Sequence, residues 1–427
     1  MRRGRPAKPA PPRTLDVEIE RLGTEGVGLA RTAGGLIPVP DTLPGERVRI
    51  RHQGKAASLL DLLSASPDRV APPCRHFTRC GGCALQHLAP TPYAAFKRSL
   101  IRDALARQGL GDVTVEAPLI SPPGSRRRAD LAARRVGAGV VLGFHGRASH
   151  QIVDLAECPV LRPRLAALLP GLRTLLAGLL RSGEPASAIL TEAETGIDLG
   201  LDLPQPPGLA ALEALAAFAT TRDLARLWWQ SGGQAPTLAA QRRPVRIRFG
   251  AVGADLPAGG FLQATEEGEA ALRQAVEQGL GPAKRIADLF AGLGTFTLAL
   301  AGGRTIHAVE SDATALGALA AAARAARLVQ VSTERRDLEA RPLLPEELAG
   351  FDAVIFDPPR AGARAQAEQL ARSSVPVLIG VSCNPATFAR DATILAEGGY
   401  VLEGVLPVDQ FLWSSHVELV GRFRRPG

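Results

Sequence analysis

The chain has 427 residues, of which 46% are hydrophobic, so it indicates a globular protein of two or three domains rather than a disordered one. No apolar stretch is long and uncharged enough to span a membrane, and no apolar segment follows the basic start. We therefore expect a cytoplasmic protein without a signal peptide. The net charge is +8, and the Pro-rich residues 1–13 carry five cations and no acid, which predicts a disordered basic tail able to hold nucleic acid loosely.

Residues 14–65 alternate short apolar and polar runs with Gly-rich turns, as in Val17–Glu20, Leu36–Val39 and Arg47–Arg51. Such alternation predicts short β-strands. Five strands of this length would form an OB-like barrel, which is a common platform for nucleic acids.

The next stretch combines irregular and helical sequence. Residues 66–90 are irregular and hold three of the five cysteines. Residues 91–110 read as a helix, because Thr91 can cap it and Gly109 can end it, and we expect it to pack on the C-terminal domain. Segments 66–90 and 111–258 together predict a central α+β domain, with strands at 139–145 and 197–203 and helices at 161–181 and 207–219.

Residues 259–427 show a different pattern, in which strand-like and helix-like segments alternate. Alternation of this kind predicts a parallel, doubly wound α/β sheet. The expected segments are 284–289, 295–301, 305–310, 313–327, 351–356, 364–372, 375–381 and 385–396, followed by strands near 400–406 and 416–424.

A glycine-rich turn follows the first of these strands. Asp288 closes the strand, Gly292 and Gly294 lie in the turn, and Glu310 ends the next strand 22 residues later. Glycines let the backbone approach a ligand, and a carboxylate at that spacing can bind ribose hydroxyls. The third glycine of dinucleotide sites and the Gly-Lys-Ser/Thr phosphate grip are both missing, so S-adenosylmethionine is favoured over NAD or ATP. Asp337, after the following strand, could meet the adenine amino group.

Two later strands end in residues suited to chemistry. One ends in Asp357-Pro358-Pro359-Arg360 and the next in Ser382-Cys383-Asn384-Pro385. Ligands of such sheets bind at the carboxyl ends of the strands, so Asp357 and Cys383 are expected at the same edge, beside the cofactor.

This pairing suits methylation of carbon 5 of a pyrimidine. A thiolate that adds to carbon 6 makes carbon 5 nucleophilic, and a base must afterwards remove the proton from carbon 5. Cys383 is the candidate nucleophile, and His416 and Glu418 are the candidate bases. Alternation along the expected strand puts both on one face.

The cysteine pattern suggests a metal site. Cys74, Cys80 and Cys83 lie close in sequence and Cys158 follows, while the odd total argues against a disulfide framework. The spacing by itself is compatible with either zinc or a [4Fe-4S] cluster.

A basic stretch is a candidate RNA surface, with Phe144 and His145 placed to stack on bases. Trp228 and Trp229 are expected in the core or at a domain interface. The basic residues are Arg126, Arg127, Arg128, Arg134, Arg135 and Arg147.

The chain resembles the RNA uracil-5-methyltransferase family. The resemblance covers nearly the whole chain and rests on Phe261-Leu262-Gln263, Asp288–Phe296, Asp357–Arg360, Ser382–Pro385 and His416-Val417-Glu418. Residues 14–65 resemble the TRAM domain, and residues 259–427 a Rossmann-like class I methyltransferase domain. The resemblance implies that Cys383 is the nucleophile, that Glu418 is the base and that Asp357 helps to hold the uracil. It also implies cofactor contacts from Gln263, Phe290, Thr295, Glu310, Asp337 and Asp357.

The resemblance also decides between the metals and suggests the substrate. Members that share Cys-Gly-Gly-Cys and a distant Cys-Pro hold a [4Fe-4S] cluster, which implies Cys74, Cys80, Cys83 and Cys158 as its ligands. The cluster favours 23S ribosomal RNA over transfer RNA. We expect a monomer that binds RNA and no membrane. The rival interpretations are the same chemistry on transfer RNA, an amino-group methyltransferase, and a non-catalytic iron–sulfur RNA-binding protein.

Overall fold

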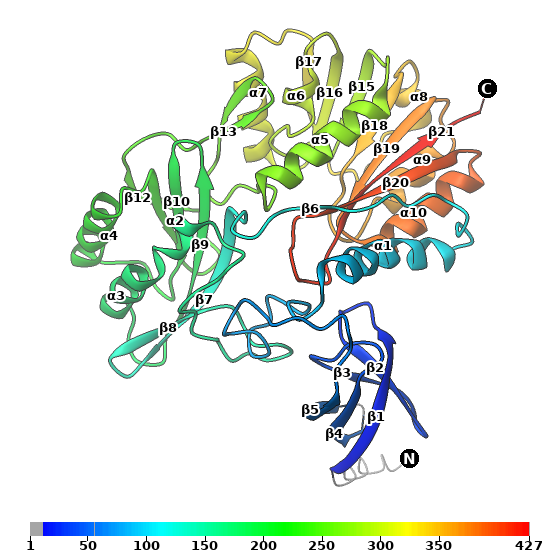
Figure 1. Cartoon of the computed structure of the whole chain (residues 1–427). Helices are drawn as coiled ribbons and strands as arrows, with labels where there is room; N and C mark the ends of the chain where they lie inside the picture. The colour runs from blue at the N-terminus through cyan, green and yellow to red at the C-terminus, as the bar shows by residue number, and fades with distance from the viewer. Residues whose placement is uncertain (1–11, 55, 427) are drawn as a thin grey trace, which may run out of the picture. The chain divides into compact units, whose positions relative to one another are not determined.

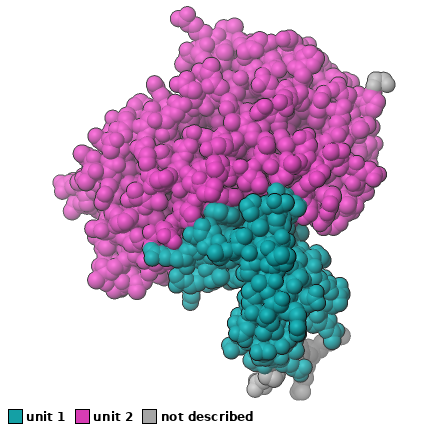
Figure 2. All heavy atoms as spheres, in the orientation of Figure 1, with its two compact units in different colours: residues 1–96, 145–151, 413–415 teal, residues 97–144, 152–412, 416–427 magenta. Residues whose placement is uncertain are grey.

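The computed structural model describes residues 12–54 and 56–426, so most of the basic tail expected over residues 1–13 lies outside the described residues (Figure 1). The chain divides into two compact units (Figure 2). Unit 1 comprises residues 1–96, 145–151 and 413–415, and unit 2 comprises residues 97–144, 152–412 and 416–427. Within the described residues, no helix combines the length and apolar character that crossing a membrane requires.

Unit 1 begins with a five-stranded antiparallel sheet in the order β3-β2-β1-β4-β5. Its edge strands β3 and β5 contact one another, as in a partly open five-stranded barrel. The core alternates along the strands, with Ile19 and Val48 fully enclosed. The predicted all-β segment is thus confirmed. The strands are β1 (Arg13–Leu22), β2 (Gly28–Thr32), β3 (Gly35–Val39), β4 (Arg47–Gln53) and β5 (Ala56–Ser64).

The segment after the sheet is tied to it by one buried carboxylate. Glu46 accepts hydrogen bonds from the backbone N–H groups of Leu43 and Ser66 and from the guanidinium of Arg69. Helix α1 (Pro90–Ala106) follows, close to the predicted helix, and Gly109 lies beyond its end with φ +78°.

The first part of unit 2 is a six-stranded sheet in the order β12-β11-β10-β9-β7-β8, against which helices α2, α3 and α4 pack. Trp228 is buried there and donates a hydrogen bond to Asp198, so the expectation of a core tryptophan is confirmed. The elements are β7 (Arg128–Val136), β8 (Gly139–Gly143), α2 (Pro163–Ala166), α3 (Leu169–Leu179), β9 (Pro185–Ala193), β10 (Gly196–Asp202), α4 (Leu209–Thr221), β11 (Arg226–Gln230) and β12 (Thr237–Gln241). The hairpin β13 (Arg246–Phe249) and β14 (Val252–Asp255) follows.

The second part of unit 2 is an eight-stranded sheet in the order β17-β16-β15-β18-β19-β21-β20-β6. Five strands run parallel, and β21 is antiparallel to both of its neighbours. The predicted doubly wound sheet is confirmed. Its strands are β15 (Arg285–Leu289), β16 (Thr305–Glu310), β17 (Val331–Arg335), β18 (Ala353–Phe356), β19 (Val377–Ser382), β20 (Val401–Asp409), β21 (Glu418–Arg424) and β6 (Leu119–Ile120).

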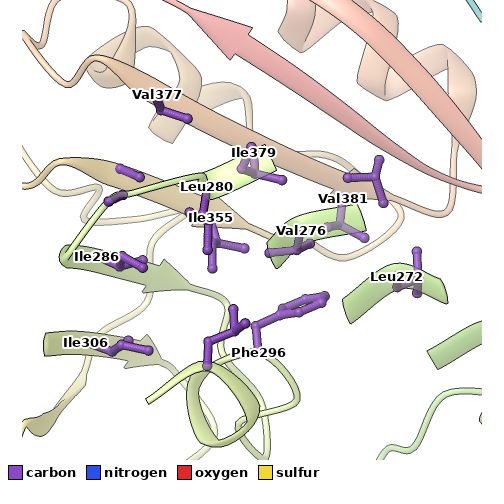
Figure 3. Close-up of a cluster of buried hydrophobic side chains, with 14 of the residues drawn as sticks. Leu272, Val276, Leu280, Ile286, Phe296, Ile306, Ile355, Val377, Ile379 and Val381 are labelled. Carbon is purple, nitrogen blue, oxygen red and sulfur yellow. The ribbon is translucent and has the colours of Figure 1, made fainter. Parts of the chain in front are cut away.

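Helices cover both faces of this sheet (Figure 1). Helix α5 (Glu266–Leu280) presents Leu272, Val276 and Leu280 at a spacing of four residues, and these pack with Ile286, Ile355 and Ile379 of the strands (Figure 3). On the other face Phe388 of α10 packs over Gly380 and Gly421. The remaining helices are α6 (Thr297–Leu300), α7 (Ala313–Ala325), α8 (Pro345–Leu348), α9 (Arg364–Leu370) and α10 (Pro385–Glu397).

Two details differ from the expected boundaries. Strand β6, expected within the central domain, pairs with β20 at the edge of the eight-stranded sheet. The last strand was expected from residue 416 but begins at Glu418, because the preceding residues form the loop after β20.

Candidate active site

The strand register brings Cys383 and Glu418 to the same edge of the sheet. Strand β19 ends at Ser382, which lies opposite Leu419 of the antiparallel strand β21. The next position on each strand is Cys383 on one side and Glu418 on the other. The negative charge of Glu418 raises the pKa of Cys383, which is a second sign that the groups are close.

Cys383 lies in the turn between β19 and helix α10. Asn384 caps the helix by accepting a hydrogen bond from the Ala386 N–H, and Pro385 occupies its first turn. Burial, together with the carboxylates of Glu418 and Asp357, raises the pKa of the Cys383 thiol to about 11, and the charge of Arg360 opposes this shift. The positive end of the α10 dipole also favours the thiolate. The thiol therefore needs positive charge nearby in order to ionise.

Glu418 and Asp357 are acids whose protons are held unusually tightly. Burial, with a smaller contribution from the charge of Asp357, raises the pKa of Glu418 to about 8. Burial also raises the pKa of Asp357 to about 7, with a contribution from Asp288. Carboxyl groups with pKa values raised in this way can exchange protons near neutral pH. A general base requires this property.

The loop that carries Asp357 is fastened to helix α10. The buried carboxylate of Asp391 accepts hydrogen bonds from the Ala363 N–H and from Arg390, which also donates to the Ala361 carbonyl. At the start of the loop, the Asp357 N–H donates to the Leu289 carbonyl at the end of β15. The positions of Asp357 and Arg360 thus depend on the same helix that follows Cys383.

The glycine-rich turn after β15 lies at the point where the strand order reverses, between β15 and β18. Phe290, Gly292 and Gly294 have φ values of +61°, +54° and +90°. At Gly294 a side chain would also lie 2.9 Å from Leu319, so both the conformation and the space require glycine.

Two carboxylates flank this turn. Glu310 Oε2 accepts a hydrogen bond from the Gly292 N–H, at 2.9 Å. Asp288 is fully buried and its Oδ2 accepts two hydrogen bonds from Thr297, while Oδ1 has no partner among the described residues. Burial raises the pKa of Asp288 to about 7, and Glu310 adds to this shift. A buried oxygen without a partner fits a site that a polar or cationic ligand completes.

The other predicted cofactor residues have different surroundings. Gln263 is buried, and its Oε1 accepts a hydrogen bond from Gln410. Thr295 is half-buried in the glycine-rich turn. Asp337 is exposed and caps its own turn by accepting from the N–H groups of Glu339 and Ala340.

The prediction that His416 and Glu418 share one strand face is wrong. His416 precedes β21 and is exposed, whereas Glu418 is the first residue of the strand and is buried. The alternation rule does not apply because the residue before Val417 belongs to the loop. Of the two candidate bases, Glu418 is the one beside Cys383.

A buried polar cluster near this loop was missed by the sequence reasoning. Lys97 of α1 is fully enclosed and forms an ion pair with the equally enclosed Asp409 at the end of β20. A signal was present, since Lys97 lies on the apolar face of the predicted helix, with Tyr93, Leu100 and Ile101.

The cysteines fall in both units. Cys74, Cys80 and Cys83 are buried in unit 1, and Cys158 is half-buried in unit 2. Burial raises the pKa of Cys80, and the Cys74 thiol contributes to the shift. Within residues 12–54 and 56–426, no three His, Cys, Asp or Glu side chains converge closely enough to hold a metal ion.

The basic stretch is less open than expected. Arg127 is buried and forms an ion pair with Glu269, and Arg147 pairs with Asp41. Arg126 lies over the ring of Phe411 and Arg128 over the ring of Phe261, whose side chain is 67% exposed. Two of the arginines therefore maintain the fold, and Arg126 and Arg128 accompany aromatic rings.

The sheet order, the glycine-rich turn and the acidic residues at the carboxyl edge define a Rossmann-like methyltransferase domain. The profile of the tRNA (Uracil-5-)-methyltransferase family matches residues 269–423, and that of the TRAM domain matches residues 12–51.

Similar proteins extend the match to nearly the whole chain. An uncharacterized RNA methyltransferase of Brucella suis biovar 1 is 46% identical over 96% of this chain and 97% of its own length. The 23S rRNA (uracil(1939)-C(5))-methyltransferase RlmD of Chromohalobacter salexigens is 35% identical over 94% of this chain and 87% of its own. Among solved structures, the Pyrococcus abyssi tRNA (uracil-54, C5)-methyltransferase in complex with S-adenosyl-L-homocysteine superimposes with a TM-score of 0.75 and 25% identity, over 96% of this chain and 100% of that one.

The chain therefore belongs to the RNA uracil-5-methyltransferase family and has an N-terminal TRAM domain. It is an S-adenosylmethionine-dependent RNA (uracil-C5)-methyltransferase.

Proposed function

We propose that this enzyme methylates carbon 5 of a specific uridine through a covalent bond between Cys383 and carbon 6, with Glu418 as the base. The observation that carries the proposal is the strand register that sets Cys383 beside Glu418. A thiol and a tightly held carboxyl group at one sheet edge are the two groups that this chemistry needs.

The proposed reaction balances in two stages. The Cys383 thiolate bonds to carbon 6, and the electrons of the ring double bond move to carbon 5. Carbon 5 takes the methyl group as the methyl–sulfur bond of the donor breaks, with its electron pair left on that sulfur. Glu418 then removes the proton from carbon 5, the ring double bond forms again, and the bond between sulfur and carbon 6 breaks. The thiolate is regenerated, and the proton remains on Glu418 until solvent takes it. Asp357, next to both groups, would hold the uracil.

The residues around the glycine-rich turn fit S-adenosylmethionine, which when bound supplies a transferable methyl group on a positively charged sulfur. Two observations support this assignment. The buried Oδ1 of Asp288 has no hydrogen-bond partner among the described residues, and the backbone has positive φ at Phe290, Gly292 and Gly294. We assign Glu310 to the ribose and Asp337 to the adenine. The proposed contacts are Gln263, Phe290, Thr295, Glu310, Asp337 and Asp357.

We assign 23S ribosomal RNA as the substrate. Supporting this, the ribosomal RNA enzyme of Chromohalobacter salexigens is 35% identical over almost the whole chain. Transfer RNA is the second candidate, because the Pyrococcus abyssi transfer RNA enzyme has the same fold at 25% identity. Arg126 and Arg128, beside Phe411 and Phe261, are suited to hold phosphates and stacked bases.

We assign a [4Fe-4S] cluster to Cys74, Cys80, Cys83 and Cys158, whose thiols do not converge on a single metal ion among the described residues. Thiolates are the ligands that such clusters take, and three of these thiols are buried within one short segment. At Gly81 a side chain would lie 2.8 Å from the His145 carbonyl, so this segment is closely packed. The methyl transfer involves no change of oxidation state, so we give the cluster a structural role.

The substrate assignment is tested with RNA from cells that lack the gene. Purified enzyme and S-adenosylmethionine labelled in the methyl group are mixed with 23S ribosomal RNA or with total transfer RNA from these cells. We expect 5-methyluridine at one site of the ribosomal RNA and no label in transfer RNA. Label in transfer RNA alone would refute the assignment to ribosomal RNA. It would not affect the proposed roles of Cys383 and Glu418.

A further inference from the structure

Lys97 is a fully buried cation that the proposed reaction does not use. Its Nζ lies 2.9 Å from Asp409 Oδ1, and neither side chain is exposed to solvent. It also donates a hydrogen bond to the backbone carbonyl of His416. Asp409 is the last residue of β20, and His416 lies two residues before Glu418. One side chain therefore joins the two ends of the loop between β20 and β21.

A second residue of the same helix contacts the middle of this loop. Tyr93 precedes Lys97 by four residues, so both lie on one face of α1. The Tyr93 hydroxyl accepts a hydrogen bond from the Trp413 N–H, at 2.7 Å, and Trp413 has the left-handed φ of +62°. Helix α1 thus bonds to the loop at Asp409, Trp413 and His416.

The loop is also bonded to its own ends. Asp409 Oδ1 accepts a hydrogen bond from the Phe411 N–H at 2.9 Å, in addition to the one from Lys97. The Asp409 carbonyl accepts from the Ser121 N–H, next to β6. Burying a charged pair this completely costs solvation free energy, which the mutual attraction of the pair offsets only when its geometry is good and its other polar atoms are hydrogen-bonded.

The contact with His416 fixes the chain just before Glu418. Strand pairing holds Glu418 from one side, because it lies opposite Val408 of β20. The Lys97 bond holds the loop that enters the strand from the other side. Without it, the first residue of β21 would be free to fray, as strand ends do when their neighbouring contacts are lost.

We propose that Lys97 is a positioning residue for the catalytic base, with Asp409 as its counter-ion and Tyr93 as a second support. The inference rests on the proposed role of Glu418. A misplaced base slows the removal of the proton from carbon 5, whereas the attack by Cys383 and the methyl transfer precede that step. Loss of Lys97 should therefore trap the methylated RNA on the protein.

The test compares four variants on RNA that contains ordinary uridine. K97M/D409N removes both buried charges, while the oxygen of the introduced amide can still accept from the Phe411 N–H. Y93F removes the hydroxyl that accepts from the Trp413 N–H and leaves the ring. K284M is the matched control, since Lys284 is exposed. E418Q removes the base itself. Three quantities are measured: kcat, KM for RNA, and the fraction of enzyme that stays bound to RNA after denaturation.

For K97M/D409N we expect kcat to fall on the order of 10- to 100-fold, as for other small displacements of a catalytic group. Because the slowed step follows the transfer of the methyl group, we expect the apparent KM for RNA to fall together with kcat. The denaturation-resistant fraction should rise above that of the wild type. Y93F should shift kcat and the denaturation-resistant fraction less, which keeps the test valid if the double variant fails to fold. K284M should match the wild type.

Two outcomes would overturn the inference. One is that turnover and adduct are as in the wild type in both K97M/D409N and Y93F. The other is that turnover falls in a folded variant without any rise in adduct, which would place the defect before proton removal. A failure of the proposed function is seen separately, because E418Q would then turn over normally or form no adduct.

Discussion

Cys383 and Glu418 occupy facing positions on neighbouring antiparallel strands, one just past the end of β19 and the other at the start of β21. They are 35 residues apart in sequence. The pairing of Ser382 with Leu419 fixes their proximity through backbone hydrogen bonds rather than through a side-chain contact. The pKa of each group lies above its usual value, so each must lose a more tightly held proton before it can act as an anion.

Replacing Glu418 by glutamine should separate the two stages of the reaction. The amide cannot take the proton from carbon 5, so turnover should fall by about 10²- to 10⁴-fold, the range usual for a lost general base. Cys383 can still add to carbon 6, and methylated RNA should accumulate on the protein. Gel electrophoresis under denaturing conditions with labelled RNA measures this. Turnover near the wild-type rate would show that another group is the base.

The value of kcat should rise with pH across the neutral range. Glu418 takes the proton from carbon 5 as an anion, after the methyl transfer, and its pKa is raised to about 8. The active form of this base therefore becomes more abundant as pH increases through that value. Cys383 must also ionise, and its pKa is raised to about 11, so alkaline conditions favour both groups. Initial rates at saturating RNA concentration check this. A flat or falling profile through that range would contradict the protonation scheme.

Asp288 should make the cofactor-free protein less stable as pH rises. Its pKa is about 7 in the folded chain and 3.8 in the reference state, so the folded protein binds the proton more tightly. The contribution is fully present below the reference pKa and is lost as pH rises through about 7; a shift of this size amounts to roughly 4 kcal/mol at most.

The variant D288N is neutral at every pH, so its stability should decline less than that of the wild type between acidic and neutral conditions. Denaturant unfolding at several pH values measures the difference. Parallel stability curves for the two proteins would contradict the raised pKa of Asp288.

The cysteine assignment predicts the metal content. Protein purified without oxygen should contain iron and inorganic sulfide in equal amounts, with four iron atoms per chain, as a [4Fe-4S] cluster requires. The variant C80A should lose most of the iron and unfold at a lower temperature. C383A serves as the matched control, since its cysteine lies outside the proposed ligand set, and it should keep the iron. Zinc in place of iron would refute the cluster.

The sequence predicted the elements of the catalytic domain well, because apolar runs ended by Gly, Pro or Asp mark buried parallel strands. Asp357 and Cys383 follow β18 and β19 as expected, and the rule that strand ends share an edge needs no further information. The position of Glu418 depended on register, which periodicity alone does not determine.

The errors have one local and two long-range causes. His416 was placed in the strand because Val417 and Leu419 continue the apolar pattern, yet the loop after β20 extends to Val417. The sequence predicts a surface position for Arg127, because its acidic partner, Glu269, lies 142 residues away. Lys97 and Asp409 are separated by 312 residues, and no local pattern shows that such charges are buried together.

The proposed reaction depends most directly on the sulfur of Cys383. Enzyme, S-adenosylmethionine and RNA that carries 5-fluorouridine at the target site should give a covalent complex that survives denaturation, because fluorine at carbon 5 cannot be removed as a proton. Peptide mapping should find the RNA on Cys383, and C383A should give no complex and no turnover. A C383A protein that still methylates RNA, or a complex attached to another residue, would contradict the proposed role of Cys383 as the nucleophile.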